Sequence, residues 1–438
     1  MSELRKSSDR CASRRDFLKA SAVAGALAGG LSVARSAHAA GSDVLKIGLI
    51  GCGGRGSGAA ANALTADPNT KLVAMGDAFA DRIETSVANL TKQFGDRVDV
   101  PAERRFAGFD AYQKVLDSGI DVVCLAETPH FRPKHLKAAV DAGKHIFCEK
   151  PVAVDAPGIR SILATSEEAK KKGLNIVSGL CWRYHTAVQE TMNRILDGAI
   201  GDIIAMQELY LCAHAGFRER DPSWSEMEYQ IRNWYYFTWL SGDHNVEQHV
   251  HSLDKALWAM HDQPPLQAFG MGGRQVRTDA SKYGDIFDHH AVCYEWPNGV
   301  RAYSYTRQQG GCFNETSDIF LGTKGRANIL KNVIEGPNAW KYESKVKCNM
   351  YVAEHEALFK AIRAGTPINN GQYMAYSTML AILGRMVNYT GKQITWEQAI
   401  NSQQTLAPAA YAWDAEPPTK PDANGNYPVA MPGVTPLV

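Results

Sequence analysis

The sequence predicts an α/β protein of two domains, the first of which contains a doubly wound parallel sheet. Its 438 residues exceed what one hydrophobic core usually holds. A glycine-rich turn follows the apolar run Val44–Ile50, and strand-like and helix-like segments alternate from there to Gly179. Such alternation is typical of right-handed β-α-β units. Hydrophobic residues at 45% and charged residues at 21% agree with a folded globular chain.

Basic and acidic residues are nearly balanced, at 47 and 46, which gives a formal net charge of +1. This balance excludes an extended basic surface for nucleic acid or anionic membranes. We therefore expect a small-molecule ligand and no nucleic-acid partner. The nine cysteines form no Cys-x-x-Cys pair and several stand in apolar runs, so buried thiols rather than disulfides are expected.

Residues 1–39 are expected to be an export signal and not part of the fold. They contain a twin arginine at Arg14-Arg15, a weakly apolar run at Ala20–Val33 and a small-x-small cleavage pattern that ends at Ala39. The apolar run is too short and too rich in glycine and alanine for a retained membrane span. The signal predicts a periplasmic or secreted protein without a membrane anchor after cleavage. Because the twin-arginine route carries folded chains, it also favours a bound cofactor.

The first domain, expected at 44–180, begins with the pattern of a dinucleotide site. An apolar strand, the turn Gly51-Cys52-Gly53-Gly54-Arg55-Gly56 and a helix-prone segment follow one another, which is the context that the G-x-G-x-x-G motif requires. The first glycine permits the tight turn, the second lets the backbone approach a pyrophosphate, and the third lets the helix pack closely on the strand. The helix N-terminus then faces the phosphates. This order of elements predicts a Rossmann fold.

An acidic residue at the end of the second strand favours NAD over NADP. The strand Lys71–Gly76 ends at Asp77, about 20 residues beyond the last glycine of the motif, where a carboxylate accepts hydrogen bonds from the adenosine ribose. The same carboxylate would repel a 2′-phosphate. Arg82 lies nearby in the sequence and keeps NADP open as an alternative.

Residues that follow the later strands of the first domain are also predicted to contact ligands, because ligands of doubly wound sheets lie at the carboxyl ends of the strands. Strands are expected at 121–126, 145–148 and 175–179, and helices at 111–116, 134–142 and 156–171. The residues predicted to contact the cofactor are Gly51, Gly53, Gly54, Arg55, Gly56, Asp77, Thr128, Pro129, His135, Glu149 and Lys150. Those predicted to contact the substrate are Trp182, Arg183, Tyr184, His244 and Asn245.

Glu149-Lys150-Pro151, which follows Gly143-Lys144-His145, carries a resemblance to a known family. With the glycine turn before it and segments such as Phe320–Gly325 and Glu354–Gly365 after it, the sequence resembles the Gfo/Idh/MocA family of sugar and cyclitol oxidoreductases over residues 46–400. The resemblance implies a second α/β domain with a large open, mostly antiparallel sheet, expected at 181–400. The segment 401–438, rich in proline, asparagine and glycine, is expected to be an extended tail or to wrap a neighbouring copy.

The resemblance also implies a catalytic lysine and histidine. In the family, the lysine of Glu-Lys-Pro, here Lys150, points at the reacting hydroxyl, and a helix of the other domain carries an Asp-x-x-x-His pattern. Glu247 stands where aspartate is common, and His251 supplies the histidine. Because residues four apart on a helix share a face, both side chains can converge on one hydroxyl. We predict His251 as the base, Lys150 as the donor to the hydroxyl oxygen and Glu247 as an orienting group.

Three neighbouring histidines, His244, His249 and His251, suggest a metal site, but their His-x4-His-x-His spacing matches no closed zinc pattern. We therefore expect no metal. The alternative to a catalytic role is a histidine buried in the core for His251, and a solvated surface lysine for Lys150. The aromatic segment Pro222–Leu240 is compatible with a sugar-facing wall and equally with core or a subunit contact.

Taken with the resemblance, the sequence predicts an exported NAD-dependent oxidoreductase that acts on the CH-OH group of a sugar, cyclitol or glycoside. The cofactor should stay bound, since no free NAD pool is expected outside the cytoplasm. An NAD-dependent glycosidase that oxidises its substrate transiently is the main alternative, and a non-catalytic sugar or dinucleotide sensor is the second. A homo-oligomer, either a dimer or a tetramer, is expected.

Overall fold

The computed structural model describes residues 44–344 and 347–437. The predicted twin-arginine signal at 1–39 lies outside the described residues. Apart from the first two, the described residues belong to one compact unit, Lys46–Val438.

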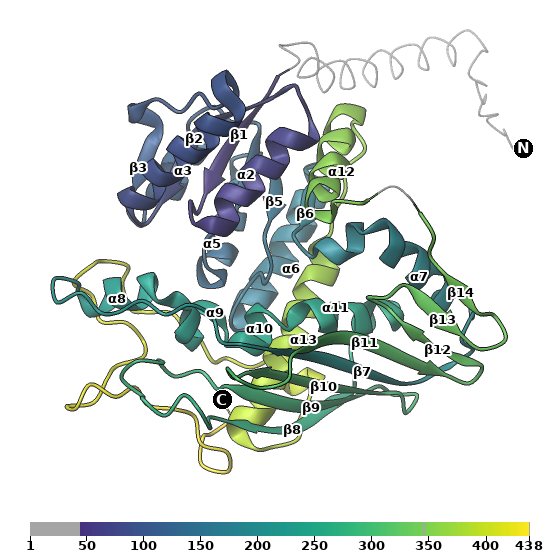
Figure 1. The fold of residues 1–438 in the computed structure, drawn as a ribbon. Helices are drawn as coiled ribbons and strands as arrows, with labels where there is room; N and C mark the ends of the chain where they lie inside the picture. Colours follow the sequence, from purple (N-terminus) through teal and green to yellow (C-terminus); the bar gives the residue numbers. More distant parts are fainter. Residues whose placement is uncertain (1–43, 345–346, 438) are drawn as a thin grey trace, which may run out of the picture. The chain divides into compact units, whose positions relative to one another are not determined.

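A six-stranded sheet forms the first half of this unit (Figure 1). Its strand order is β3-β2-β1-β4-β5-β6, and the pairs β1–β4, β4–β5, β5–β6 and β2–β3 are parallel. This order reverses at β1, as in a doubly wound sheet, and confirms the predicted Rossmann fold. The strands are β1 (Leu45–Ile50), β2 (Thr70–Asp77), β3 (Arg105–Ala107), β4 (Val122–Leu125), β5 (His145–Cys148) and β6 (Ile176–Ser178).

Five helices connect these strands, and their bounds follow from local signals in the sequence. In α6, for example, the Asp155 side chain accepts a hydrogen bond from Gly158 N, Pro157 stands in the first turn, and Lys170 and Lys171 lie in the last turn. Each feature favours a helix at that position. The helices are α2 (Gly54–Ala66), α3 (Ala80–Phe94), α4 (Ala111–Leu116), α5 (Arg132–Asp141) and α6 (Ala156–Lys171).

A nine-stranded sheet forms the second half, in the order β14-β13-β12-β11-β7-β10-β9-β8-β15. Only the pair β7–β10 is parallel among its registered pairs, so the sheet is mostly antiparallel, as expected. The strands are β7 (Ile203–Cys212), β8 (Gln267–Gly273), β9 (His289–Glu295), β10 (Arg301–Gln308), β11 (Glu315–Gly322), β12 (Gly325–Asn328), β13 (Val333–Glu335), β14 (Trp340–Lys341) and β15 (Ile394–Thr395).

One face of the large sheet is covered by α11 (Val250–Ala259) and α13 (Gly371–Thr390), as Figure 1 shows. Side chains of β10 alternate between this buried face and the opposite face, which is the pattern of a strand packed on one side. The strand register places five exposed apolar side chains together on the uncovered face. They are Phe269, Met271, Tyr303, Tyr305 and Leu321.

Two helices follow the large sheet's strand β14 in the chain, α12 (Met350–Ala364) and α13, and a short connection separates them. Gly365 has a φ of +63° and ends α12 in the left-handed region, which glycine adopts readily. Pro367 follows two residues later and disfavours a helical conformation at the residue before it. The remaining helices are α7 (Thr186–Leu196), α8 (Glu226–Arg232), α9 (Thr238–Ser241), α10 (His244–Glu247) and α14 (Trp396–Ile400).

The tail beyond Ile400 has no helix or strand among residues 402–437 and runs along its own chain. The hydroxyl of Tyr411 lies 2.8 Å from Nε2 of His130 in the first domain. The ring of Trp413 packs against Phe79 and Phe109, with centroids 5.2 and 4.5 Å apart. These contacts place the tail against its own first domain, and the extended tail and its contact with a neighbouring copy stay predictions.

Among the described residues, none of the helices combines the length and the apolarity that a membrane crossing needs. The eight described cysteines are free thiols. Five of them are buried, while Cys312 is exposed, which differs from the buried thiols that the sequence predicted.

Candidate active site

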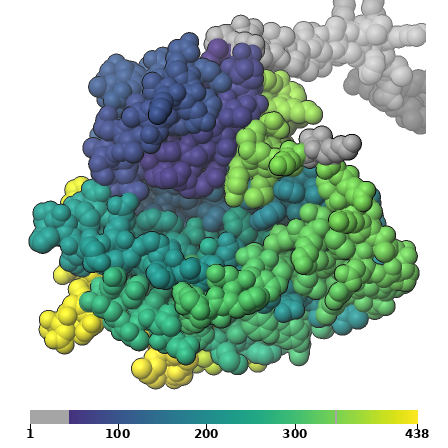
Figure 2. Space-filling view, viewed as in Figure 1, coloured from purple at the N-terminus to yellow at the C-terminus, as the bar shows by residue number. Residues whose placement is uncertain are grey.

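A cavity of about 410 Å³ lies between the domain of the six-stranded sheet and the domain of the nine-stranded sheet. Residues of both domains line it. Figure 2 shows the purple and blue surface of the first domain directly against the teal surface that follows it in the chain. From the first domain come the glycine turn and the residues after β2, β4 and β5. From the second come Ile231, Trp234, Glu247, His251 and Tyr351.

The glycine turn has a geometry that other residues cannot adopt. Gly51 has a φ of +90°, and a Cβ there would lie 2.3 Å from Glu127 N. A Cβ on Gly56 would lie 1.7 Å from the carbonyl oxygen of Gly51, so α2 could not approach β1 as closely. By contrast, a Cβ on Gly54 would meet nothing within 4 Å. Two of the three motif glycines therefore have a steric reason within the chain itself.

The N-terminus of α2 is suited to an anion. Its N-cap Gly53 provides no side-chain hydrogen bond, so the first amides of the 13-residue helix keep no capping acceptor. Arg55, in the same turn, forms an ion pair with Glu149, in which Nε lies 2.6 Å from Oε1, and its guanidinium lies over the ring of Tyr351 at 4.9 Å. Free amides, an adjacent cation and a glycine-rich approach fit the pyrophosphate of a dinucleotide.

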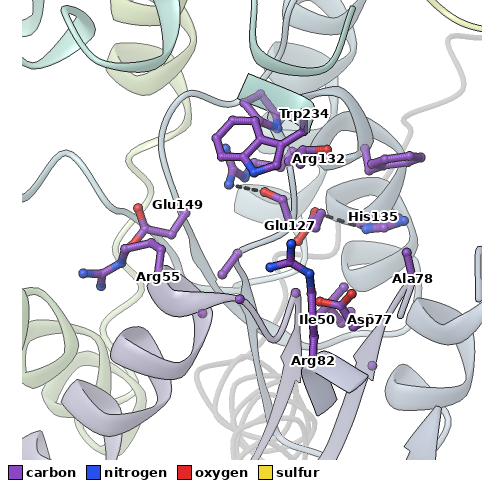
Figure 3. Close-up of a pocket in the computed structure, with 18 of the residues that line it drawn as sticks. Ile50, Arg55, Asp77, Ala78, Arg82, Glu127, Arg132, His135, Glu149 and Trp234 are labelled. Atoms are coloured by element: carbon purple, nitrogen blue, oxygen red, sulfur yellow. Dashed lines mark hydrogen bonds and ion pairs between the residues drawn. The ribbon is translucent and has the colours of Figure 1, made fainter. Parts of the chain in front are cut away.

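Asp77 lies at the end of β2, as predicted, and lines the cavity. Its carboxylate accepts hydrogen bonds from Cys52 N at 2.6 Å and Phe79 N at 3.0 Å, which fix its orientation toward the turn. Burial raises the pKa of Asp77, although both amides and Arg82 oppose that shift. Figure 3 shows Arg82 beside Asp77, so the side chain that kept NADP open lines the same cavity.

The predicted residues after β4 also reach the cavity. Thr128, Pro129 and His135 line it, and Thr128 Oγ1 has no hydrogen-bond partner among the described residues. His135 stacks on Tyr112 with centroids 4.2 Å apart, and its Nδ1 lies 3.1 Å from Oε1 of Glu127. Figure 3 shows the His135 and Glu127 side chains joined by a dashed line. These contacts fix the imidazole at the cavity that a dinucleotide would occupy.

Lys150 and Glu247 meet across the domain boundary. Lys150 Nζ donates to the main-chain carbonyl of Glu247 at 2.6 Å and to its Oε1 at 2.9 Å. Their side chains keep 14% and 18% exposure, and both line the cavity. Since an ammonium carries three donors and these two bonds use two of them, one donor of Lys150 remains for a ligand.

The helical spacing expected for Glu247 and His251 is wrong. Glu247 ends α10, Gln248 and His249 form a turn, and His251 lies in α11. His251 N bonds to Gln248 O at 3.5 Å and leaves the Glu247 carbonyl to Lys150. The break therefore has a chemical reason, because an uninterrupted helix would engage that carbonyl in its own ladder. Both side chains still line the same cavity.

His251 is a neutral imidazole at the cavity wall. Burial lowers its pKa well below the ordinary histidine value, and the nearby Lys150 and Lys255 cations lower it further. Its Nδ1 has no hydrogen-bond partner among the described residues, and Lys255 Nζ donates to its main-chain carbonyl at 2.5 Å. A neutral imidazole with an unpaired ring nitrogen can accept a proton from a bound hydroxyl.

The predicted substrate residues after β6 do not line the cavity. Arg183 donates to Asp254 and Asp262 in ion pairs of 2.9 and 2.6 Å and has 9% side-chain exposure. The Tyr184 hydroxyl donates to Asn370, and Trp182 packs on the core. The turn Cys181–Tyr184 is thus a connection between the domains, whose polar groups are satisfied within the protein.

His244 and Asn245 are also misplaced by the sequence prediction. Both have 0% exposure and neither lines the cavity. Asn245 Nδ2 donates to the Ala381 carbonyl at 2.8 Å, while His244 Nδ1 lies 2.8 Å from Asp243 Oδ1. They occupy the N-terminal turn of α10, which faces α13. The cavity begins only at the other end of this short helix.

Other lining residues escaped the sequence analysis. Tyr351, near the start of α12, has no motif around it, although it contacts Arg55 of the glycine turn. Trp234 lines the cavity, whereas Tyr236 and Trp239 of the same aromatic segment are buried in a second hydrophobic cluster. The aromatic composition of this segment was the one available signal, and it does not separate the two roles.

A protein-family model connects this geometry with a known family. The model for the Gfo/Idh/MocA oxidoreductase family, NAD-binding Rossmann fold, matches residues 45–176. Residues 45–176 are thus similar to the NAD-binding Rossmann domain of this family. They contain the glycine turn, Asp77 and the Glu149-Lys150 pair, so the match covers most of the first-domain wall of the cavity.

Curated relatives extend the similarity into the second half. A 2,7-anhydro-N-acetylneuraminate hydratase of Escherichia coli is 28% identical over 216 residues, which are 48% of this chain and 51% of that protein. The chain therefore spans about half the length of this relative. A myo-inositol 2-dehydrogenase of Thermotoga maritima is 23% identical over 283 residues, 64% of this chain and 74% of that protein.

Solved structures share the complete architecture. The aldose-aldose oxidoreductase of Caulobacter crescentus, solved with glycerol, has a TM-score of 0.62 and covers 80% of this chain and 99% of its own. At 18% identity this likeness establishes the fold. The combination of a parallel Rossmann sheet and a mostly antiparallel open sheet thus matches the fold of this solved structure.

Proposed function

We propose that this protein is an NAD-dependent oxidoreductase that acts on a secondary hydroxyl of a sugar, cyclitol or glycoside. The observation that carries the proposal is the meeting of Lys150, Glu247 and His251 at a cavity that also contains the glycine turn. The family match and the inositol dehydrogenase relative support this reaction class.

The chain's own residues supply the acid-base chemistry. His251 accepts the hydroxyl proton, and the remaining donor of Lys150 stabilises the negative charge that develops on the oxygen. Glu247 holds the lysine through two acceptors, and so fixes where that donor points. Bound nicotinamide would supply the hydride acceptor. Gly51, Gly53 and Gly54 with Arg55 would hold its pyrophosphate.

Asp77 supports NAD over NADP, since its carboxylate is held at the end of β2 where the adenosine ribose would bind. A 2′-phosphate there would meet a carboxylate, although Arg82 is adjacent. We further propose that the dinucleotide stays bound between turnovers. Arg55, Glu149 and Tyr351 support this because they join the glycine turn to α12 of the second domain.

The proposed location is the periplasm or the exterior, reached through the twin-arginine route. Arg14-Arg15, the apolar run and the Ala39 cleavage pattern support it. Fractionation of cells that produce the full chain tests the location, and Arg14→Lys with Arg15→Lys should leave the protein in the cytoplasm. Export of the double variant at the wild-type level would contradict the proposal.

A glycosidase that oxidises transiently and then eliminates is the second candidate. The relative named as a hydratase favours it, because hydration is a reaction without net oxidation. Such chemistry uses the same Lys150 and His251, and returns the hydride at the end of each cycle. A non-catalytic sensor is the weaker alternative, because it would not need the unpaired ring nitrogen of His251 beside Lys150.

We also propose a homo-oligomer built on the uncovered face of the large sheet. Phe269, Met271, Tyr303, Tyr305 and Leu321 make this face apolar, which is unusual for a surface left in water. Light scattering after gel filtration should give a dimer or tetramer, and Met271→Glu with Tyr305→Glu should give a monomer. A monomeric wild type would exclude the oligomer.

Two measurements on the purified protein test the activity. Denaturation should release NAD or NADH, and mass spectrometry should identify the products of a panel of sugars, cyclitols and glycosides. A keto-sugar supports the dehydrogenase, and a hydrolysed glycoside supports the glycosidase. Absence of released nucleotide together with absence of NAD binding on titration would remove both enzymes. Release of NADP would reverse the assignment based on Asp77.

A further inference from the structure

Asp243, His244 and His290 form a buried cluster on the far side of α10 from the cavity. All three side chains have 0 to 2% exposure. The Asp243 Oδ1 atom lies 2.8 Å from His244 Nδ1 and 3.2 Å from His290 Nε2. One ligand atom from each residue lies within 4.8 Å of the other two. Two imidazoles and one carboxylate thus converge from β9 and from the start of α10.

The nitrogens of this cluster are not satisfied by hydrogen bonds. Among the described residues, His244 Nδ1, His244 Nε2 and His290 Nε2 have no hydrogen-bond partner. The two that approach Asp243 lie 2.8 and 3.2 Å from its Oδ1 as ion-pair contacts, and His244 Nε2 has no acceptor of this kind near it. Buried polar atoms in native proteins have partners. A ligand that accepts their lone pairs would provide one.

The carboxylate is held in place by groups behind it. Asp243 Oδ2 accepts hydrogen bonds from Phe287 N at 2.9 Å and from the Tyr389 hydroxyl at 2.6 Å. The other oxygen is thereby turned toward the two histidines. On the far edge of His290, Nδ1 lies 3.0 Å from the side-chain amide of Asn388. Such outer partners are typical of metal ligands, whose orientation they fix.

The backbone of Asp243 is strained in a way that this placement explains. It has a φ of 84° and a ψ of 158°, a conformation that belongs almost only to glycine. Strain of this kind persists where surrounding contacts fix the residue, and it is frequent at functional sites. The preceding Gly242 has a φ of 78°, so two consecutive left-handed residues turn the chain into α10.

We propose that Asp243, His244 and His290 bind one divalent transition metal of the Zn²⁺ class. Imidazole nitrogen and carboxylate oxygen are ligands that Zn²⁺ binds in proteins, and two histidines with one acid match its three-protein-ligand sites. The carboxylate supplies the negative charge. Arg385 is a nearby cation, and the buried Asp285 is an anion beside it that offsets its charge. The sequence analysis missed the site because His290 lies on β9, far from the histidine-rich stretch.

The site would support the active site without taking part in its chemistry. Asp243 is the N-cap of α10, and Glu247, which bonds to Lys150, is the last residue of this four-residue helix. A metal at one end would therefore fix the acceptor at the other. Metal removal is expected to loosen Glu247 and to lower thermal stability, since a metal that binds only the folded state stabilises it.

Metal analysis of the full chain tests the proposal independently of any activity. Plasma mass spectrometry of the purified protein, or of protein dialysed against Zn²⁺ after chelation, should give about one equivalent per chain. Replacement with Co²⁺ should give visible absorption bands of a bound ion. Chelation should lower the melting temperature, and Zn²⁺ should restore it. Protein that contains no metal and takes up neither Zn²⁺ nor Co²⁺ would overturn the proposal.

Matched variants assign the ligands. His290→Gln and Asp243→Asn should each weaken Zn²⁺ binding by more than about tenfold, as loss of a ligand contact does. His289→Gln is the control, because His289 is the adjacent histidine, is 39% exposed on its side chain and pairs with Asp288 instead. If the ligand variants fold poorly, the chelation and restoration series on the wild type decides. Equal metal content in His290→Gln, Asp243→Asn and wild type would place any bound metal elsewhere and overturn the assignment.

Discussion

The two walls of the cavity are built in different ways. The first-domain wall consists of short motifs at consecutive strand ends: the glycine turn, Asp77 and Glu149-Lys150. The second-domain wall collects Trp234, Glu247, His251 and Tyr351 from segments far apart in the chain. The first wall is encoded locally, because each motif fixes its own backbone. The second depends on how helices and loops pack, so its chemistry is assembled only in the folded protein.

The largest effect should come from the two side chains proposed to act on the hydroxyl, one from each wall of the cavity. Lys150→Met and His251→Gln should each lower kcat by about 10²- to 10⁴-fold, because each removes a proton-transfer or charge-stabilising group. The melting temperature of both variants, and the nucleotide bound to His251→Gln, should stay close to wild type. Lys331→Met and His214→Gln, both at exposed positions, are the matched controls. Near-wild-type turnover in both active-site variants would place the chemistry elsewhere.

A comparison of two glycines tests how strictly the glycine turn of the first wall fixes the packing of α2 on β1. Gly56→Ala should lower the free energy of unfolding by about 1–3 kcal/mol, because its Cβ would overlap the Gly51 carbonyl. Gly54→Ala should change it by no more than about 0.5 kcal/mol, because open space surrounds that position. Chemical denaturation of the nucleotide-free proteins measures both. Equal stability of the two variants would mean that α2 shifts freely on β1.

A smaller effect is expected from the carboxylate of the second wall. Glu247→Gln should lower kcat by about tenfold, less than His251→Gln, because the amide keeps an acceptor oxygen and the main-chain bond to Lys150 remains. Both variants are compared on one substrate, with kcat and KM measured separately. A loss in Glu247→Gln that equals or exceeds that of His251→Gln would show that the negative charge is essential and would make Glu247 the leading candidate for the base.

The smallest expected effect is on the pH dependence of the activity, and it is measured on the wild-type protein. A base must be neutral to accept a proton, so activity falls as the pH drops through the pKa of the folded protein. Because burial and Lys150 lower the pKa of His251, the acid limb of kcat/KM should lie below the ordinary value of about 6.5. Between these two values the unfolded chain binds the proton and the folded chain does not, so stability also falls with acidification. An acid limb above 6.5 would exclude His251 as the base.

The sequence predicted the first domain closely and the second in outline. The helix at 156–171 and the strand at 145–148 have the predicted bounds, since capping residues and apolar runs act locally. The glycine turn, Asp77, Thr128, Pro129 and His135 reach the cavity for the same reason. Their roles in binding stay predictions.

The predictions that were wrong concerned residues whose positions depend on contacts with parts of the chain far away in the sequence. Arg183 seemed free to meet a ligand at the end of β6, but Asp254 and Asp262 come from α11 and the turn after it and neutralise it. His244 and His251 look alike in the sequence, yet the helix break at Gln248 and His249 sends one into the core and the other into the cavity. No periodicity predicts a break at which the freed carbonyl accepts a hydrogen bond from a lysine in another domain.

Because of that break, Lys150 joins the two domains through its two hydrogen bonds to Glu247. Any motion that widens the cavity by separating its walls must first withdraw the ammonium from the Glu247 carbonyl and carboxylate. Entry and exit of a large ligand would then depend on the same lysine that we propose to contact the substrate. If the dinucleotide stays bound as proposed, an opening that releases it would also separate Lys150 from Glu247, so loss of the nucleotide and loss of the proposed reactive arrangement would occur together.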